Sequence, residues 1–401
     1  MMEFFDVINY VFVAIMVSVA VAWVMLIKSM IVSFTETPSL DRFEKKSHGR
    51  PRVSIILPAR NEEGFIEKCL NSLLDQDYDN YEIVAIDDSS EDNTGKIIVE
   101  YARKNPKIIH VSARPKPDGW MGKNWACSEG YKKATGELLL FTDSDTKHSK
   151  SVVSLAVDHL LSLELDALTV IPKMNCLDTL TRITLPVLST FLHTRFSALR
   201  VNDPTKKTGY FFGSFFIITK KTYESVGTHE SVKNEIIEDG ALGKKVKESG
   251  HKMRMVGGTH LVDAVWARDW STLWNGLKRL MIPLYLQNGK IAGGIFVAVL
   301  FLLFMPYVFL VYSAAFVGQS QSFTTLFVMS AISSSLVYLA GVIDSRALQL
   351  KIWYGLCGPV GSFVVVAGFF YGILQAKSSK SVSWRGRDYS MKDHVQNSIS
   401  I

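Results

Sequence analysis

The stretch Ala134-Thr-Gly-Glu-Leu-Leu-Leu-Phe-Thr-Asp-Ser-Asp-Thr146 turns an apolar run directly into two closely spaced carboxylates. Leu138–Phe141, bounded by Gly136, is typical of a short strand covered on both faces in a parallel sheet. Asp143 and Asp145 follow at its carboxyl end, where open α/β sheets bind ligands. In a turn, both carboxylates can face one Mg²⁺ or Mn²⁺, whose other ligands are water and phosphate oxygens. Taken alone, these residues also fit a solvated turn rich in Asp and Ser.

The residues on either side of this stretch repeat the same alternation of strand and helix. Short apolar runs end in polar loops, and segments of helical spacing follow them. Strands that alternate with helices in this way predict a parallel sheet with helices on both faces. The expected strands are 53–57, 81–86, 108–111 and 138–141, and the expected helices include 65–74 and 94–104.

A second acidic pair, Asp87-Asp88, ends the strand expected over 81–86. Because the carboxyl ends of parallel strands meet at one edge of a sheet, a ligand there would contact both acidic clusters. Between the two clusters lies a Gly-Trp-Met-Gly-Lys-Asn-Trp segment that ends in Lys123-Asn-Trp125. Its glycines allow close backbone approach, and Lys123 offers a point charge for phosphate. Without these neighbours, Lys123 would be interpreted as an ordinary surface lysine.

The hydrophobic content, 48% of the 401 residues, is high for a soluble enzyme and is concentrated in four stretches. Each is long enough to cross a hydrocarbon core of about 30 Å. The first lacks the basic start of a signal peptide and is expected to be a retained anchor. The stretches are 4–27, 291–317, 323–343 and 352–374.

Five segments follow from this distribution. They are an N-terminal anchor (1–34), a basic linker (35–52), a catalytic domain (53–290), C-terminal transmembrane helices (291–375) and a basic tail (376–401). Lys and Arg follow the first stretch but do not precede it, so the central domain is expected on the cytoplasmic side of the cell membrane. Three later spans would put the tail outside, whereas its basic residues favour the inside, so one stretch is expected to be re-entrant.

The net charge of +6 comes without a basic stripe interleaved with aromatic residues. It favours anionic lipid headgroups or a phosphorylated ligand as partners and argues against nucleic acid. The four cysteines form no C-x-x-C pair, so the sequence predicts neither a zinc site nor a disulfide framework.

Five motifs in fixed order resemble a family 2 inverting glycosyltransferase with the GT-A fold, a Rossmann-like nucleotide-diphospho-sugar transferase domain. The resemblance extends from Val53 to about Trp274 and is strongest to membrane members that modify lipids, of the carotenoid and hopanoid-associated types, with ceramide glucosyltransferase more distant. A Gln/Arg-x-x-Arg-Trp signature of the processive members is missing at this spacing, which argues against polymer synthesis. The motifs are Val53-Ser-Ile-Ile-Leu-Pro-Ala-Arg-Asn-Glu-Glu63, Ile86-Asp-Asp-Ser-Ser90, Gly122-Lys123, Asp143-Ser-Asp145 and Ile237-Glu-Asp-Gly240.

The resemblance implies roles for individual residues. Lys123 would lie near the diphosphate, Asp145 would bind the metal, and Asp239 would be the catalytic base. The position of Asp87 and Asp143 at strand ends adds them to the expected donor site, and Asp143 to the metal ligands. Residues expected around the nucleoside are Ala59, Glu62 and Asp88.

Several segments of the second half fit more than one structure. Leu180–Leu199 fits an interfacial helix or an ordinary amphipathic helix on the sheet. The aromatic run Tyr210–Phe216 fits core or an acceptor groove, and Glu238-Asp239 also fits the start of a helix. Three indoles, at positions 266, 270 and 274, would share one helical face.

Together these patterns predict a metal-dependent glycosyltransferase. It would move a sugar from a nucleotide-sugar donor, expected to be a UDP-sugar, to a lipid acceptor at the cytoplasmic membrane face, with Mg²⁺ or Mn²⁺ as cofactor. The alternatives are a polyprenyl-phosphate glycosyltransferase and a membrane protein that binds nucleotide-sugars without turnover. A transporter is disfavoured because the apolar stretches hold almost no charge.

Overall fold

The computed structural model describes residues 2–43, 49–378, 381–384 and 387–390. The chain divides into two compact units. The first, here called the sheet unit, comprises residues 37–175, 198–266 and 379–401. The second, the apolar unit, comprises residues 1–36, 176–197 and 267–378.

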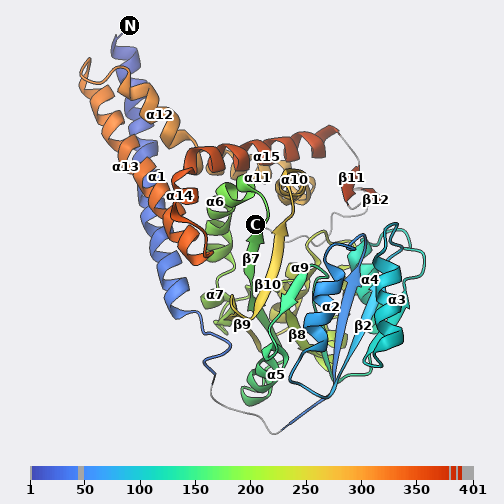
Figure 1. Ribbon diagram of the computed structural model, residues 1–401. Coiled ribbons are helices and arrows are strands. Elements are labelled where there is room, and N and C mark those ends of the chain that lie inside the picture. Colours follow the sequence, from blue (N-terminus) through green and yellow to red (C-terminus); the bar gives the residue numbers. More distant parts are fainter. Residues whose placement is uncertain (1, 44–48, 379–380, 385–386, 391–401) are drawn as a thin grey trace. The chain divides into compact units, whose positions relative to one another are not determined.

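A seven-stranded sheet in the order β3-β2-β1-β4-β8-β6-β9 forms the centre of the sheet unit (Figure 1). The four strands expected from the sequence are present, and β1 pairs in parallel with both β2 and β4, as β2 does with β3. The sheet is mixed, however, because β8 runs antiparallel to both β4 and β6. The strands are β1 Val53–Ala59, β2 Tyr81–Asp87, β3 Ile108–Ser112, β4 Leu138–Phe141, β6 Ala167–Ile171, β8 Phe216–Thr219 and β9 Met253–Gly257.

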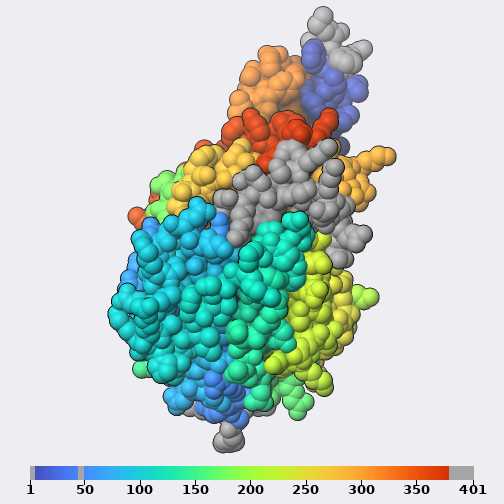
Figure 2. All heavy atoms as spheres, turned by 90° about the vertical axis from the view of Figure 1, so that its right-hand side faces the viewer, coloured from blue at the N-terminus to red at the C-terminus, as the bar shows by residue number. Residues whose placement is uncertain are grey.

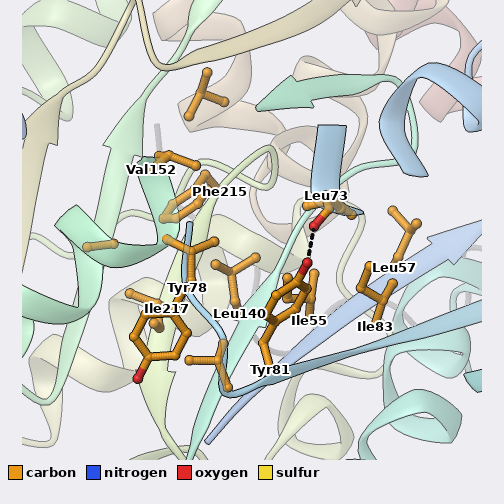
Figure 3. Packing of buried hydrophobic residues seen from close by; sticks show 14 of the residues in the cluster. Ile55, Leu57, Leu73, Tyr78, Tyr81, Ile83, Leu140, Val152, Phe215 and Ile217 are labelled. Atoms are coloured by element: carbon orange, nitrogen blue, oxygen red, sulfur yellow. Dashed lines mark hydrogen bonds between the residues drawn. The ribbon is translucent and has the colours of Figure 1, made fainter. Parts of the chain in front are cut away.

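Apolar side chains leave β1 on both faces, as expected for a strand covered by helices on each side. Ile55 and Leu57 pack with the helices α2 (Ile66–Leu74) and α5 (Val152–Ser162). Ile56 packs on the other face with α4 (Gly122–Tyr131) and α9 (Glu238–Glu248). Figure 3 shows the first face, where the Tyr81 hydroxyl also donates a hydrogen bond of 2.9 Å to the Leu73 carbonyl. In Figure 2 the blue to teal atoms of the first part of the sheet unit form a continuous surface on the face turned to the viewer.

The helices of the sheet unit include the two expected over 65–74 and 94–104. A second, three-stranded sheet has the order β5-β10-β7. The helices are α2 Ile66–Leu74, α3 Thr94–Lys104, α4 Gly122–Tyr131, α5 Val152–Ser162, α7 Ala198–Asn202, α8 Lys220–Ser225, η1 His229–Val232 and α9 Glu238–Glu248. The second sheet consists of β5 Thr146–His148, β7 Lys173–Cys176 and β10 Val262–Ala267.

The apolar unit is helical, with α1 lying along α13 (Figure 1). Three of its described helices are long and apolar enough to cross a membrane, and a fourth span results if α11 and α12 are counted together. These two helices bend by 49° where they meet. Pro306 explains the break, because proline lacks an N–H and disfavours helical geometry in the residue before it. The helices are α1 Met2–Glu36, α6 Thr179–Arg195, α10 Trp270–Gln287, α11 Gly289–Leu303, α12 Met305–Ala314, α13 Gln321–Ala347, α14 Ile352–Leu356 and α15 Gly358–Ser378.

This division differs from the expected catalytic domain over 53–290, because α6 and α10 both belong to the apolar unit. A buried polar cluster attaches α6 to α13. Asp344, on α13 and fully buried, accepts a hydrogen bond from Thr190 and contacts His193 Nδ1 at 2.8 Å. Hydrogen bonds of this kind join helices where water is absent. The segment 180–199, expected as an interfacial or an ordinary amphipathic helix, thus contributes α6 to the apolar unit, where it contacts α1, α13 and α15.

Two other expectations concern the indoles and the tail. Trp270 and Trp274 stack on α10 with ring centroids 5.2 Å apart, but Trp266 lies on the strand β10, so the three do not share one helical face. Most of the expected basic tail over 376–401 lies outside the described residues. Its described part after α15 pairs β11 Ser381–Trp384 with β12 Arg387–Ser390.

We predict that Leu140→Ala lowers the free energy of unfolding of the sheet unit by about 2–5 kcal/mol. Leu140 is fully buried in the central strand β4, so its truncation leaves a cavity that the close-packed core cannot fill. Thermal unfolding of the purified protein in detergent measures the effect. Leu177→Ala, which truncates a half-exposed leucine, is the control, and equal shifts in the two variants would contradict the prediction.

Candidate active site

The expected donor residues lie at the carboxyl ends of β1, β2 and β4. Ala59, the last residue of β1, is in register with Asp87, and the Asp88 amide donates a 2.9 Å hydrogen bond to the Ala59 carbonyl. Asp143 follows β4 by two residues, and β4 is the other parallel neighbour of β1. The adjacent strand pairings thus bring the acidic residues after β2 and β4 to one edge of the sheet.

The loops after β1 and β2 are tied together by hydrogen bonds. The Glu62 amide donates to Thr94 Oγ1 at 2.7 Å, and Asp87 Oδ1 accepts from the Ser90 amide at 3.0 Å. Arg60 donates to the carbonyls of Asp88 and Ser89. The two loops therefore form one braced wall, in which Glu62 and Asp88 are 1% and 4% exposed.

Lys123 links two carboxylates from different parts of the fold. It lies in the first turn of α4, and its Nζ is 2.7 Å from Asp143 Oδ1 and 2.6 Å from Glu238 Oε1. Burial opposes the positive charge, but the carboxylates of Asp143, Glu238 and Asp239 outweigh it and hold the pKa of Lys123 well above its usual value. Lys123 is therefore a fixed cation at the strand ends.

Asp239 lies in the first turn of α9, and a backbone amide contacts each of its carboxylate oxygens. The Gly213 amide donates to Oδ2 and the Gly240 amide to Oδ1, both at 2.7 Å. Burial, together with the adjacent Glu238 charge, raises the pKa of Asp239 above its usual value, although Lys123 opposes the shift. A carboxyl group with a raised pKa at a site of this kind is a candidate general base.

Gly213 occupies the centre of this cluster. A Cβ built there would lie 2.8 Å from Asp239 Oδ2, 2.9 Å from Lys123 Nζ and 3.2 Å from Asp143 Oδ2. The three charged groups thus converge on one glycine, and only a residue without a side chain lets them approach its backbone so closely.

The side chains around Asp143 and Asp145 suit a hard cation that brings ligands of its own. Among the described residues no group of three or more His, Cys, Asp or Glu side chains forms a metal site. The carboxylates of Asp145, Asp143 and Glu62 lie near the buried Cys69 thiol, whose pKa is raised by burial first and then by these charges. Two carboxylates fit Mg²⁺ or Mn²⁺ when water and phosphate oxygens complete its shell.

Sequence reasoning identified Lys123, Asp143 and Asp239, and the structure brings these three together. It treated Glu238 only as part of a helix start, although Glu238 is 4% exposed and pairs with Lys123. It left Tyr210–Phe216 open between core and groove, and missed that the Gly213 amide contacts Asp239. The signal for that contact was the Gly-Ser pair inside an aromatic run, which indicates close backbone approach.

Comparison with known proteins places this geometry in a family. Residues 54–227 match the model of Glycosyl transferase family 2. The chain is 24% identical over 359 residues to 4,4'-diaponeurosporenoate glycosyltransferase of Staphylococcus aureus (strain USA300), a match that covers 84% of this chain and 88% of the relative. It is 29% identical over 157 residues to the probable glycosyltransferase YdaM of Bacillus subtilis (strain 168), covering 37% of each chain.

The match to a 4,4'-diaponeurosporenoate glycosyltransferase of Staphylococcus haemolyticus is shorter, with 35% identity over 107 residues that span 28% of that relative. Among solved structures, the mannosyltransferase PcManGT from Pyrobaculum calidifontis, in complex with GDP-Man and Mn²⁺, superposes with a TM-score of 0.53 at 18% identity. That likeness covers 81% of this chain and 97% of PcManGT and concerns the fold. The expected resemblance is confirmed: residues 54–227 form a domain that matches glycosyl transferase family 2, and the fold is that of GT-A enzymes.

Proposed function

We propose that the protein transfers a sugar from a nucleotide-sugar, a UDP-sugar in the first instance, to a lipid acceptor at the cytoplasmic face of the membrane. The observation that carries the proposal is the convergence of Lys123, Asp143 and Asp239 on Gly213 at the carboxyl ends of the strands. A fixed cation and a carboxylate with a raised pKa are the two groups that such a transfer needs near the diphosphate and the acceptor.

On the donor side, the braced wall after β1 and β2 would hold the nucleoside. Ala59, Glu62, Asp87 and Asp88 belong to this wall, and its hydrogen bonds fix the shape before a ligand binds. Lys123 would stabilise negative charge on the diphosphate as the sugar leaves. Nucleotide-sugars are bound by the solved relative PcManGT, whose complex contains GDP-Man.

A divalent cation would be held by Asp143 and Asp145. When bound, Mg²⁺ or Mn²⁺ supplies positive charge to the leaving diphosphate as a Lewis acid. The two carboxylates fit that task because they leave ligand positions for phosphate oxygens and water.

On the acceptor side, Asp239 would act as the general base. The acceptor hydroxyl gives its proton to the carboxylate as its oxygen forms a bond to the anomeric carbon. The bond from that carbon to the diphosphate oxygen breaks with its electron pair, and the nucleoside diphosphate leaves. One displacement of this kind inverts the anomeric centre and needs one base.

The lipid acceptor is inferred from the apolar unit and from the relatives. Three helices, or four spans with the bent pair, are more than one tether requires. An acceptor chain that stays in the hydrocarbon avoids a cost of about 0.8 kcal/mol for each methylene exposed to water. The name of the S. aureus relative, a diaponeurosporenoate glycosyltransferase, supports an acceptor of this class.

Incubation of membranes that contain the protein with radiolabelled UDP-glucose, UDP-N-acetylglucosamine or GDP-mannose tests the proposal. We expect label from one donor in an organic-extractable product, and none from control membranes. An acid-labile product would indicate a polyprenyl-phosphate acceptor instead. Label only in soluble saccharide or polymer, or in no product with any donor, would contradict the proposal.

We predict that Asp239→Asn abolishes transfer, with a loss of about 10²–10⁴-fold in rate, while metal-dependent UDP binding is retained. The amide keeps the shape of the side chain but offers no basic oxygen. Transfer assays and UDP titration of the same preparation separate the two effects. Loss of UDP binding would remove Asp239 from the role of base.

Asp145→Ala should instead weaken UDP binding in the presence of Mn²⁺, because the cation joins the carboxylate to the diphosphate. Calorimetric titration with UDP, with and without Mn²⁺, measures the difference between wild type and variant. EDTA should abolish transfer by the wild-type protein. Full activity in EDTA would show that the reaction needs no divalent cation.

The pH dependence of kcat/KM should follow the protonation of Asp239. The raised pKa means that the base is active only at higher pH, so the acidic limb should lie well above the ~3.9 of an ordinary aspartate. Four groups face Asp239: Glu238 on its own helix, Lys123, Asp143 and the Tyr210 phenol.

Glu238→Gln removes a like charge beside Asp239 and should move the acidic limb to lower pH, whereas Glu235→Gln is the matched control. Glu235 is also buried, but the charges with the largest effect on the pKa of Asp239 are those of Glu238, Lys123 and Asp143. A limb at the same pH in wild type and Glu238→Gln would contradict the assignment of Asp239 as the titrating base.

A further inference from the structure

The short loop between Tyr210 and β8 brings the Gly213 amide to Asp239, and two buried hydroxyls hold this loop. Thr169, on β6 and fully buried, accepts a hydrogen bond from the Phe212 amide at 2.9 Å and donates one to the Phe215 carbonyl at 3.0 Å. Its hydroxyl therefore closes the loop at both ends. Gly213 and Ser214 are the two residues between these hydrogen-bonded ends.

The second hydroxyl belongs to Thr142, which donates to the Ser214 carbonyl at 2.8 Å. Thr142 Oγ1 lies 3.0 Å from Nε2 of His148, a buried side chain whose pKa burial lowers to about 4. A neutral imidazole of this kind is a fixed hydrogen-bonding partner and adds no charge near Asp239. The loop is thus held from β6 on one side and from the end of β4 on the other.

The hydrogen bonds of the loop leave little freedom for the Gly213 amide. The Phe215 amide donates to the Phe212 carbonyl at 3.0 Å, so the loop also closes on itself. Thr169 is the one polar residue of β6 and lies between Leu168 and Val170. A buried hydroxyl in such a strand needs a hydrogen-bond partner. Within the described part of the chain, the Thr169 hydroxyl hydrogen-bonds only to this loop.

We propose that Thr169 is a positioning residue for the transfer reaction: its hydroxyl fixes the loop that aims the Gly213 amide at Asp239 Oδ2. The inference rests on the proposed role of Asp239 as base. Thr169 does not touch the reacting atoms, and it acts by keeping the carboxylate in one orientation. A base displaced by about 1 Å can lose 10²-fold in rate without any loss of substrate binding.

Thr169→Val tests the proposal because valine keeps the shape and removes the hydroxyl. We expect kcat for sugar transfer to fall by about ten- to a hundredfold, with the donor KM and the affinity for UDP with Mn²⁺ unchanged. Thr169→Ser, which retains the hydroxyl, should restore kcat to near the wild-type value. Leu168→Ala is the control, since it disturbs the same strand on its other face and should leave kcat unchanged.

Hydrogen–deuterium exchange of the peptide that contains residues 210–216 gives a readout that does not depend on turnover. Exchange should be faster in Thr169→Val than in wild type, and slow again in Thr169→Ser. Unchanged exchange, a kcat within twofold of wild type, or equal losses in Thr169→Val and Leu168→Ala would each overturn the proposal. An absence of transfer by the wild-type protein would instead contradict the proposed function, while the exchange result would still decide the role of Thr169 in the loop.

Discussion

The site depends on one shared charge. Lys123 contacts Asp143 and Glu238 directly and lies close enough to Asp239 to act on its pKa, so one ammonium group serves three carboxylates from two separate segments. Without that cation, nothing would oppose the rise in the pKa of Asp239 that burial and Glu238 cause, and the loop after β4 would lose its tie to α9. The excess of negative charge also supports the proposed divalent cation, which would share Asp143 with Lys123.

The packing of β4 and α9 in the sheet unit holds these charged side chains in fixed positions. β4 is a fully buried strand, and it places Asp143 beside the end of β1. α9 begins at Glu238, and its first turn favours acidic residues there because of the helix dipole. The Gly213 amide then joins the antiparallel half of the sheet to Asp239. The strand order, the start of α9 and the loop before β8 together leave no room for a Cβ at position 213.

Much of this arrangement could be predicted from local patterns. Val53–Leu57 and Leu138–Phe141 are apolar runs with polar ends, so their identity as parallel strands and the position of Asp143 followed from the sequence. The antiparallel strand β8 could not be predicted, because Phe216–Thr219 is too short for its direction to leave a pattern. The hydrogen bond between Thr169 and Phe212 could not be predicted either. Threonine is common in strands, so its presence in β6 gives no sign of a special contact. The place of α6 depends on Asp344, 151 residues from His193 in the sequence.

A structure of the protein crystallised with UDP and Mn²⁺, with the metal located by its anomalous scattering, would test the central claim most directly. The account predicts one Mn²⁺ ligated by Asp143 or Asp145 and by the diphosphate, Lys123 Nζ within hydrogen-bond distance of a phosphate oxygen or of Asp143, and the uracil beside Ala59 and Asp88. UDP bound away from the carboxyl ends of β1, β2 and β4, or a diphosphate that contacts neither Lys123 nor a metal on these carboxylates, would contradict it.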